Sequence, residues 1–129
     1  MRSQFVKKLE QGCQSWNEWR KQNQDTVIDL SRAILTGMNL SGYNLSKCRF
    51  VATDFIDTNL ENADLSNADC RRARFIAANL KRTIFDFAVL DGADFLTAVV
   101  SQTSLKGLDL TTINLTSFDL KNTCLDKTN

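Results

Sequence analysis

A large apolar residue stands at every fifth position of this chain from Leu30 to Leu125, for twenty consecutive repeats. Eighteen of the twenty central positions hold Leu or Phe, and the register is never lost. Five residues advance a helix by about 140° and place successive strand positions on opposite faces. Neither regular element keeps these side chains together, whereas a chain that bends once per repeat does.

A second register of mostly small residues lies two positions before each centre, as at Ala63 and Thr58. The other three positions of each repeat are largely polar. Gly37, Gly92 and Asn67 each fall two residues after a centre, and Gly and Asn tolerate the positive φ that tight turns need. The pattern predicts a solenoid in which two side chains per repeat point to a shared axis and three face water.

The predicted core is made of the central apolar residues. They are Leu30, Leu35, Leu40, Leu45, Phe50, Phe55, Leu60, Leu65, Phe75, Leu80, Phe85, Leu90, Phe95, Leu105, Leu110, Leu115, Leu120 and Leu125. Two of the four cysteines, Cys48 and Cys70, occupy the inward registers, where a free thiol behaves as a small apolar group. Because the cysteines form no CxxC pair, we expect reduced thiols in a reducing compartment.

Several repeats resemble the A(D/N)LXX pattern of the pentapeptide-repeat family. Residues 63–67 read ADLSN, residues 78–82 read ANLKR and residues 93–97 read ADFLT. The resemblance extends over about residues 26 to 126. It implies an all-β solenoid, a right-handed quadrilateral β-helix with four pentapeptides per coil and about five coils. The arrangement is also similar to small cyanobacterial members of the family, most of which have no assigned biochemical role.

The first 25 residues do not follow the five-residue register. Phe5, Leu9, Cys13, Trp16 and Trp19 recur at spacings of three and four, which predicts an amphipathic helix from about residue 3 to residue 23. Repeat arrays need amphipathic ends to stay soluble, so we expect this helix to cap the solenoid rather than to present its tryptophans to a ligand. The predicted organisation is a capping helix and linker over 1–25 and a solenoid over 26–129.

Both ends of the solenoid carry bulky residues in the register that is otherwise small. They are Ile28, Met38 and Tyr43 in the first coil, and Leu108, Ile113 and Phe118 in the fifth. Interior coils need small residues there because four walls converge on a packed axis, whereas an end coil has space to fill. The C-terminal end is then plugged either by its own side chains or by another subunit.

Outward charges twenty residues apart alternate in sign, as stacked coils of twenty residues would favour. The predicted ladders are Asp29, Arg49 and Asp69; Asp54, Arg74 and Asp94; Glu61 and Lys81; and Asp86, Lys106 and Asp126. A basic cluster of Arg71, Arg72, Arg74, Lys81 and Arg82 lies among these carboxylates. Nucleic-acid affinity rests on uncompensated positive charge, so we interpret this cluster as a neutralised surface.

The sequence offers no support for catalysis or for cofactor binding. It contains no histidine, its serines and cysteines have no recognisable activating partner, and no phosphate-binding, zinc or calcium spacing occurs. A formal charge of +1 gives no general attraction to nucleic acid or to a membrane. With no run of about 18 apolar residues and no hydrophobic leader, we expect a cytoplasmic protein.

Outward apolar residues that a solenoid does not need are the clearest functional signal. Ile56, Ile76 and Leu96 are predicted to stack on one side, with Val51 near the edge; Ile84, Phe87 and Val89 are predicted to share a corner. Contiguous apolar stripes often mark interaction surfaces. We therefore predict a non-enzymatic scaffold or interaction module that binds an unknown protein partner or a second copy of itself.

The alternative is a DNA mimic directed at a type II topoisomerase, as some pentapeptide-repeat proteins are. Such mimicry requires a dense negative surface. Residues 26–129 carry 12 acidic and 11 basic side chains, a net charge of −1. This near balance disfavours the mimic.

Overall fold

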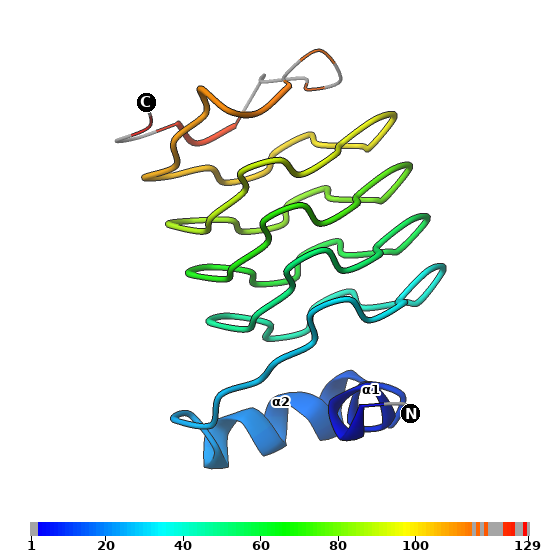
Figure 1. The fold of residues 1–129 in the computed structure, drawn as a ribbon. Coiled ribbons are helices and arrows are strands. Elements are labelled where there is room, and N and C mark those ends of the chain that lie inside the picture. The colour runs from blue at the N-terminus through cyan, green and yellow to red at the C-terminus, as the bar shows by residue number, and fades with distance from the viewer. Residues whose placement is uncertain (1–2, 115, 117, 119–122, 126–127, 129) are drawn as a thin grey trace.

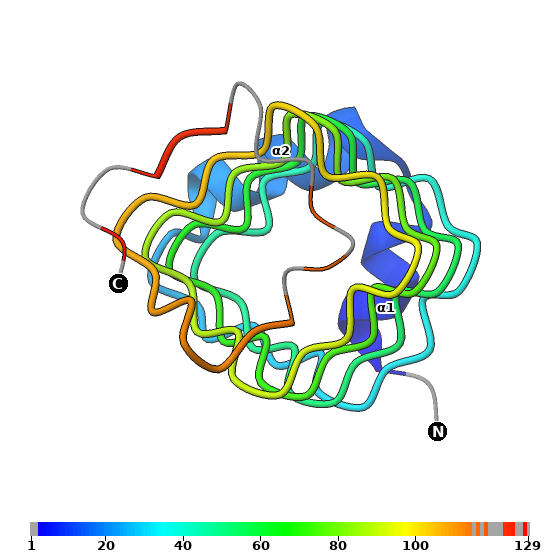
Figure 2. The same cartoon turned by 90° about the horizontal axis from the view of Figure 1, so that it is seen from above.

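The computed structural model describes residues 3–114, 116, 118, 123–125 and 128. Two short helices, α1 (Gln4–Leu9) and α2 (Cys13–Gln22), come first in the chain. Flat coils then stack one above another, with the helices beneath the first coil (Figure 1). Viewed along the stack, the coils superimpose on a single closed outline (Figure 2).

Each coil contains twenty residues, because residues twenty apart pair through parallel β-bridges such as Asp29 with Arg49. The Leu30 N–H donates to the Arg49 carbonyl at 2.8 Å, and the Arg49 N–H donates to the Ile28 carbonyl at 2.9 Å. In the described part of the coils these contacts are isolated bridges rather than extended strands, since the chain turns after every third residue of a repeat. The predicted coil length is confirmed.

A tight turn follows each centre from Leu30 to Leu105. The Ala33 N–H donates to the Leu30 carbonyl at 3.0 Å, which closes the first of these turns. From Leu30 to Leu105 the residue two positions after the centre has positive φ, with 72° at Gly37, 58° at Asn67 and 59° at Arg72. Type II turns require positive φ at this position, which glycine and asparagine adopt at low cost.

Asp and Asn are frequent just before the centre because their side chains support the turn. The Asp64 carboxylate accepts the Ser66 N–H at 2.9 Å, and the Asn59 amide oxygen accepts the Glu61 N–H at 3.0 Å. This side-chain hydrogen bond mimics a backbone turn. Six of the ten acidic residues that the structure describes in the coils make this bond and so have a local structural role, which the five-residue pattern alone did not indicate.

The centres line one continuous apolar axis. Every central side chain from Leu30 to Leu105 is buried. On one wall Phe55 and Phe75 stack with ring centroids 4.8 Å apart, and Phe75 stacks on Phe95 at 5.0 Å. Where threonine replaces alanine in the small register, its hydroxyl is satisfied: Thr53 donates to the Leu30 carbonyl of the coil below at 2.8 Å.

The predicted core is wrong near the C-terminus. Leu125 is 37% exposed and Leu110 is only partly buried, while Leu115 and Leu120 lie outside the described residues. Bridges tie the described residues of the fifth coil to the fourth coil on one side only. The orange segment crosses the end of the tube in Figure 2, where Phe118 packs edge-on against Phe95 at 5.0 Å.

The predicted single helix is also wrong, because Gly12 adopts φ 105° and separates α1 from α2. Glycine adopts this conformation far more easily than other residues. Leu9 and Trp16 are nevertheless fully buried against the first coil, and Phe5, Cys13 and Trp19 are partly buried there.

Side chains of α2 bond to the open backbone edge of the first coil. The Trp16 indole N–H donates to the Asn44 carbonyl at 2.7 Å, and the Asn17 side-chain oxygen accepts the Asn44 N–H at 2.8 Å. Arg20 donates to the Ser46 carbonyl at 2.8 Å. These polar groups take the place of a preceding coil along one side of the tube.

Two of the predicted charge ladders contain ion pairs. Arg49 lies 3.3 Å from Asp29, and Arg74 lies 3.5 Å from Asp54. Glu61, however, pairs with Arg82 at 3.6 Å rather than with Lys81, because the guanidinium one residue further along the turn reaches it. The remaining ladder also differs from prediction. Asp86 accepts the backbone N–H of Lys106 at 3.2 Å, and Asp126 lies outside the described residues.

Candidate functional site

An apolar corner, formed by Ile84, Phe87 and Val89, lies on the outside of the third and fourth coils. Their exposed fractions are 37%, 49% and 42%, in the order given. Ile84 and Val89 each stand just before a buried centre, and Phe87 occupies the turn between them. Three of the four outward positions from residue 84 to residue 89 therefore present apolar side chains to solvent, and the fourth is Asp86.

Phe87 adopts φ 61°, a conformation that is unfavourable for a bulky side chain. The same turn position holds Lys47 in the first coil, Asn67 in the second and Gly107 in the fourth. The repeat does not require an aromatic residue there. The turn requires the positive φ, whereas the aromatic side chain has no role in the turn, and this makes Phe87 the starting point for a functional hypothesis.

Gly107 gives the Phe87 ring its position. A Cβ atom on Gly107 would lie 2.4 Å from two ring carbons of Phe87, so the ring rests directly on the glycine backbone. Gly107 itself has φ 73°. The absence of a side chain at Gly107 thus leaves room for the ring against the next coil, while the Phe87 side chain remains 49% exposed.

The other predicted apolar surface, formed by Ile56, Ile76, Leu96 and Val51, is less exposed than expected. Ile56, Ile76 and Val51 are half-buried, and only Leu96, at 58%, is well exposed. Residues at equivalent turns lie one above another at the spacing of about 4.8 Å between stacked strands, so neighbouring coils shield them. Leu96 is therefore the part of this column that is available to a partner.

Three further apolar residues are exposed, although they were not among those predicted to form an interaction surface. Val27 is 71% exposed, Ile34 is 75% exposed and Val99 is 52% exposed. Ile34 and Val99 stand just before a centre, where Asp or Asn normally supports the turn. An apolar residue at that position gives up this hydrogen bond, and this is the signal that could have identified Ile34, Ile84, Val89 and Val99 together.

Most of the predicted basic cluster is paired with acidic side chains. Arg71 lies 2.6 Å from Asp69, and hydrogen bonding to the Arg71 guanidinium holds the pKa of the Asp69 carboxyl below its usual value. Arg74 and Arg82 bind Asp54 and Glu61, as described above. Among the described residues Arg72 has no ion pair, and its side chain lies over Gly92.

The buried cysteines are poor nucleophiles. Burial raises the pKa of Cys48 to about 12 and that of Cys70 well above its usual range, so both are protonated thiols at neutral pH. No three Asp, Glu or Cys side chains in the described part of the chain gather closely enough to hold a metal ion. Neither described helix is long and apolar enough to cross a membrane.

The repeat geometry agrees with a match to a family model described as pentapeptide repeats, in eight copies over residues 28–62 and 58–95. These residues make up more than half of the chain. The chain belongs to the pentapeptide-repeat family. Pentapeptide-repeat proteins fold as right-handed β-helix solenoids. No curated protein matches this pentapeptide-repeat chain in sequence.

Several solved structures are similar to this pentapeptide-repeat protein. HetL, a pentapeptide-repeat protein involved in heterocyst differentiation regulation from the cyanobacterium Nostoc sp. strain PCC 7120, is 20% identical over 60% of this chain and 48% of its own, with a TM-score of 0.36. AT2G44920, from the Arabidopsis thaliana thylakoid lumen, is 24% identical over 78% of this chain and 63% of its own, with a TM-score of 0.37. Rfr23, from the cyanobacterium Cyanothece 51142, is 19% identical over 88% and 92%, with a TM-score of 0.27. This chain thus spans less than two thirds of HetL and of the Arabidopsis protein.

Proposed function

We propose that this pentapeptide-repeat protein is a non-enzymatic scaffold or interaction module that binds another protein through the outer side of its coils. The observation that carries the proposal is the apolar corner. Apolar groups on a surface favour burial against a partner by about 25 cal/mol per Å² of area removed from water. Phe87 is the expected anchor, because aromatic residues, phenylalanine among them, are enriched in the cores of protein interfaces.

In this proposal the two parts of the chain have different tasks. Residues 1–25 cap the first coil, and residues 26–129 form a quadrilateral solenoid of five coils that carries the binding surface. Unpaired buried cysteines suit a reducing, cytoplasmic location. The near balance of charge on the coils gives no support to DNA mimicry.

Residues that other coils hold at the equivalent positions provide substitutions that the fold should tolerate and that test the proposal. Phe87→Lys introduces the residue found at the equivalent turn of the first coil, and Ile84→Asn introduces a residue that supports the turn elsewhere. We expect the double variant to fold normally and to lose binding. Pull-down from an extract of the source organism measures partner binding, and sedimentation equilibrium measures self-association.

Asn67→Lys is the matched control, because it adds the same charge one coil below Phe87 without removing an apolar group. The proposal predicts that wild type and Asn67→Lys retain the same partner or the same dimer, and that the double variant loses it. If all three proteins have the same bound partners and the same mass, the apolar corner is not the binding surface.

A further inference from the structure

The first coil has an open backbone edge along residues 29–36. Within the described part of the chain, the N–H groups of Asp29 and Ile34 make no hydrogen bond, and neither do the carbonyls of Asp29, Ser31, Ile34 and Thr36. In the second coil the equivalent groups are occupied: the Val51 carbonyl, for example, accepts the Arg32 N–H at 2.9 Å. The first coil therefore presents, in regular order, the groups that a preceding coil would bind.

The capping helix occupies these groups along a different side of the coil. On that side Asn17, Trp16 and Arg20 bond to the Asn44 N–H, the Asn44 carbonyl and the Ser46 carbonyl. These are the same three backbone groups of the repeat that remain free at Asp29 and Ser31. The cap thus shows that external donors and acceptors can complete this edge, and it leaves residues 29–36 uncovered.

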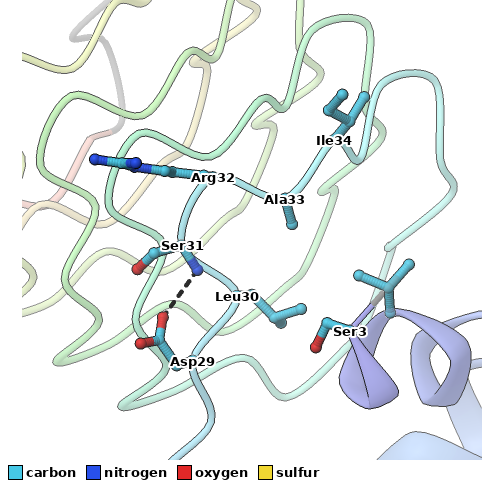
Figure 3. Close-up of a pocket in the computed structure, with 8 residues that line it drawn as sticks. Ser3, Asp29, Leu30, Ser31, Arg32, Ala33 and Ile34 are labelled. Atoms are coloured by element: carbon cyan, nitrogen blue, oxygen red, sulfur yellow. Dashed lines mark hydrogen bonds between the residues drawn. The ribbon is translucent and has the colours of Figure 1, made fainter. Parts of the chain in front are cut away.

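A hollow of about 510 Å³ lies between the start of α1 and this edge. Ser3 and Val6 line it on the helix side, and residues 29–34 line it on the coil side (Figure 3). Ile34 lines the hollow, and Val27 lies two residues before the first coil residue of its lining. They are the two most exposed large apolar residues in the described part of the chain, at 75% and 71%. Unpaired edges flanked by exposed apolar side chains are templates for an additional strand.

The charge beside the edge is positive. A second hollow, of about 630 Å³, shares Asp29, Ser31 and Arg32 with the first and runs up the coils. Its lining contains four arginines, Arg32, Arg49, Arg71 and Arg72, against the two carboxylates of Asp29 and Asp91. Arg49 and Arg71 are paired with aspartates, whereas Arg32 and Arg72 have no ion pair among the described residues.

We propose that residues 27–36 bind an acidic peptide segment of a partner protein, which follows the turn at Arg32 and pairs with the first coil as a preceding coil would. The peptide backbone pairs with the free N–H and carbonyl groups at Asp29 and Ile34, as strand addition does at other exposed sheet edges. Alternate apolar side chains pack beside Val6 and Ile34. The carboxylates of the peptide face Arg32. The Arg32 side chain extends away from those of Leu30 and Ala33 (Figure 3).

The probe is a fluorescein-labelled peptide of about eight residues, one for each of residues 27–34. Val alternates with Glu in it because successive side chains of an extended segment point to opposite faces. Two control peptides separate the contribution of charge from that of backbone hydrogen bonding. One has Lys in place of Glu, and the other carries N-methyl groups on alternate backbone nitrogens, which removes donors without changing charge. Fluorescence anisotropy with the full-length protein measures binding.

Two protein variants complete the design. Arg32→Glu reverses the unpaired charge, and Lys47→Glu makes the same change at the equivalent turn position of the same coil, where φ is also positive. We expect the acidic peptide to bind, Arg32→Glu to weaken it by about tenfold or more, which corresponds to about 1.4 kcal/mol, and Lys47→Glu to leave it unchanged. The Lys-containing and N-methylated peptides should bind far more weakly.

The proposal is overturned by no binding of the acidic peptide up to about 1 mM, or by equal binding of the N-methylated peptide, since charge alone would then explain attachment. A wild-type dimer that Ile34→Asn dissociates, without peptide binding, would identify a second copy as the occupant and also overturn it. This edge is separate from the apolar corner, so the Phe87→Lys result has no bearing on it.

Discussion

Phe75→Ala is expected to lower the free energy of unfolding by about 3 to 5 kcal/mol, the usual range for removing a buried phenylalanine. The Phe75 side chain is 0% exposed. Its ring stacks between Phe55 and Phe95 at 4.8 and 5.0 Å, and meets Phe85 edge-on at 5.5 Å. Coils above and below hold the backbone at fixed spacing, so the cavity cannot collapse. Urea denaturation followed by circular dichroism measures the change.

The matched control is Phe87→Ala. It makes the same substitution at a turn on the outside of the coil that contains Phe75. Because the Phe87 side chain is 49% exposed, this change should cost less than about 1 kcal/mol. Similar losses for the two variants would contradict the assignment of Phe75 to the axis and of Phe87 to the surface.

Trp16→Ala is expected to cost about 3 to 5 kcal/mol and to expose the first coil. Trp16 is 0% exposed, and its ring centroid lies 6.4 Å from that of Tyr43. Its indole N–H donates to the Asn44 carbonyl at 2.7 Å. Its removal leaves both a cavity and an unpaired carbonyl. Hydrogen exchange should show faster exchange in the first coil than in the third, in addition to the loss of stability.

Two further substitutions divide the contribution of Trp16. Trp16→Phe retains most of the packing but loses the indole donor, so it should cost about 1 to 3 kcal/mol. Trp19 is only partly buried, against Phe5 and beneath the Lys8 ammonium, and Trp19→Ala should cost less than Trp16→Ala. If the two alanine variants lose equal stability, Trp16 is not the anchor of the cap.

The coil architecture could be predicted from sequence because one physical requirement repeats without interruption. A central residue such as Leu65 must be buried in every coil, and a turn residue such as Asn67 must tolerate positive φ. Charge pairs such as Asp54 with Arg74 then indicate the coil length independently. Each repeat indicates the same geometry, so a single position that departs from the pattern does not change the predicted coil.

The ends of the chain were predicted less well because they are not periodic. The break at Gly12 depends on how α2 docks on the first coil, where the Tyr43 hydroxyl also donates to the Leu9 carbonyl at 2.8 Å. Leu125 keeps the apolar register but lacks the burial that interior coils provide. Local sequence does not contain the contacts on which either outcome depends.

The candidate sites depend on departures from the repeat rather than on the repeat itself. Phe87 could be selected from sequence because an aromatic residue at a turn is unusual. The exposure of Ile34 could have been predicted from its place just before a centre, but the unpaired backbone edge beside it depends on where α2 docks. A periodic pattern predicts which residues face outward, but not which outward residues are left uncovered.

Cysteine accessibility tests the inward and outward registers most directly, because three native cysteines sample different positions of the repeat. Cys70 is a centre, Cys48 lies two residues before a centre, and Cys124 lies on the exposed outer side. Native protein is treated with iodoacetamide, and modified peptides are quantified over time by mass spectrometry. We expect Cys124 to react in the folded protein, whereas Cys48 and Cys70 should react only after unfolding. Modification of Cys70 as fast as that of Cys124 in the folded protein would contradict this expectation.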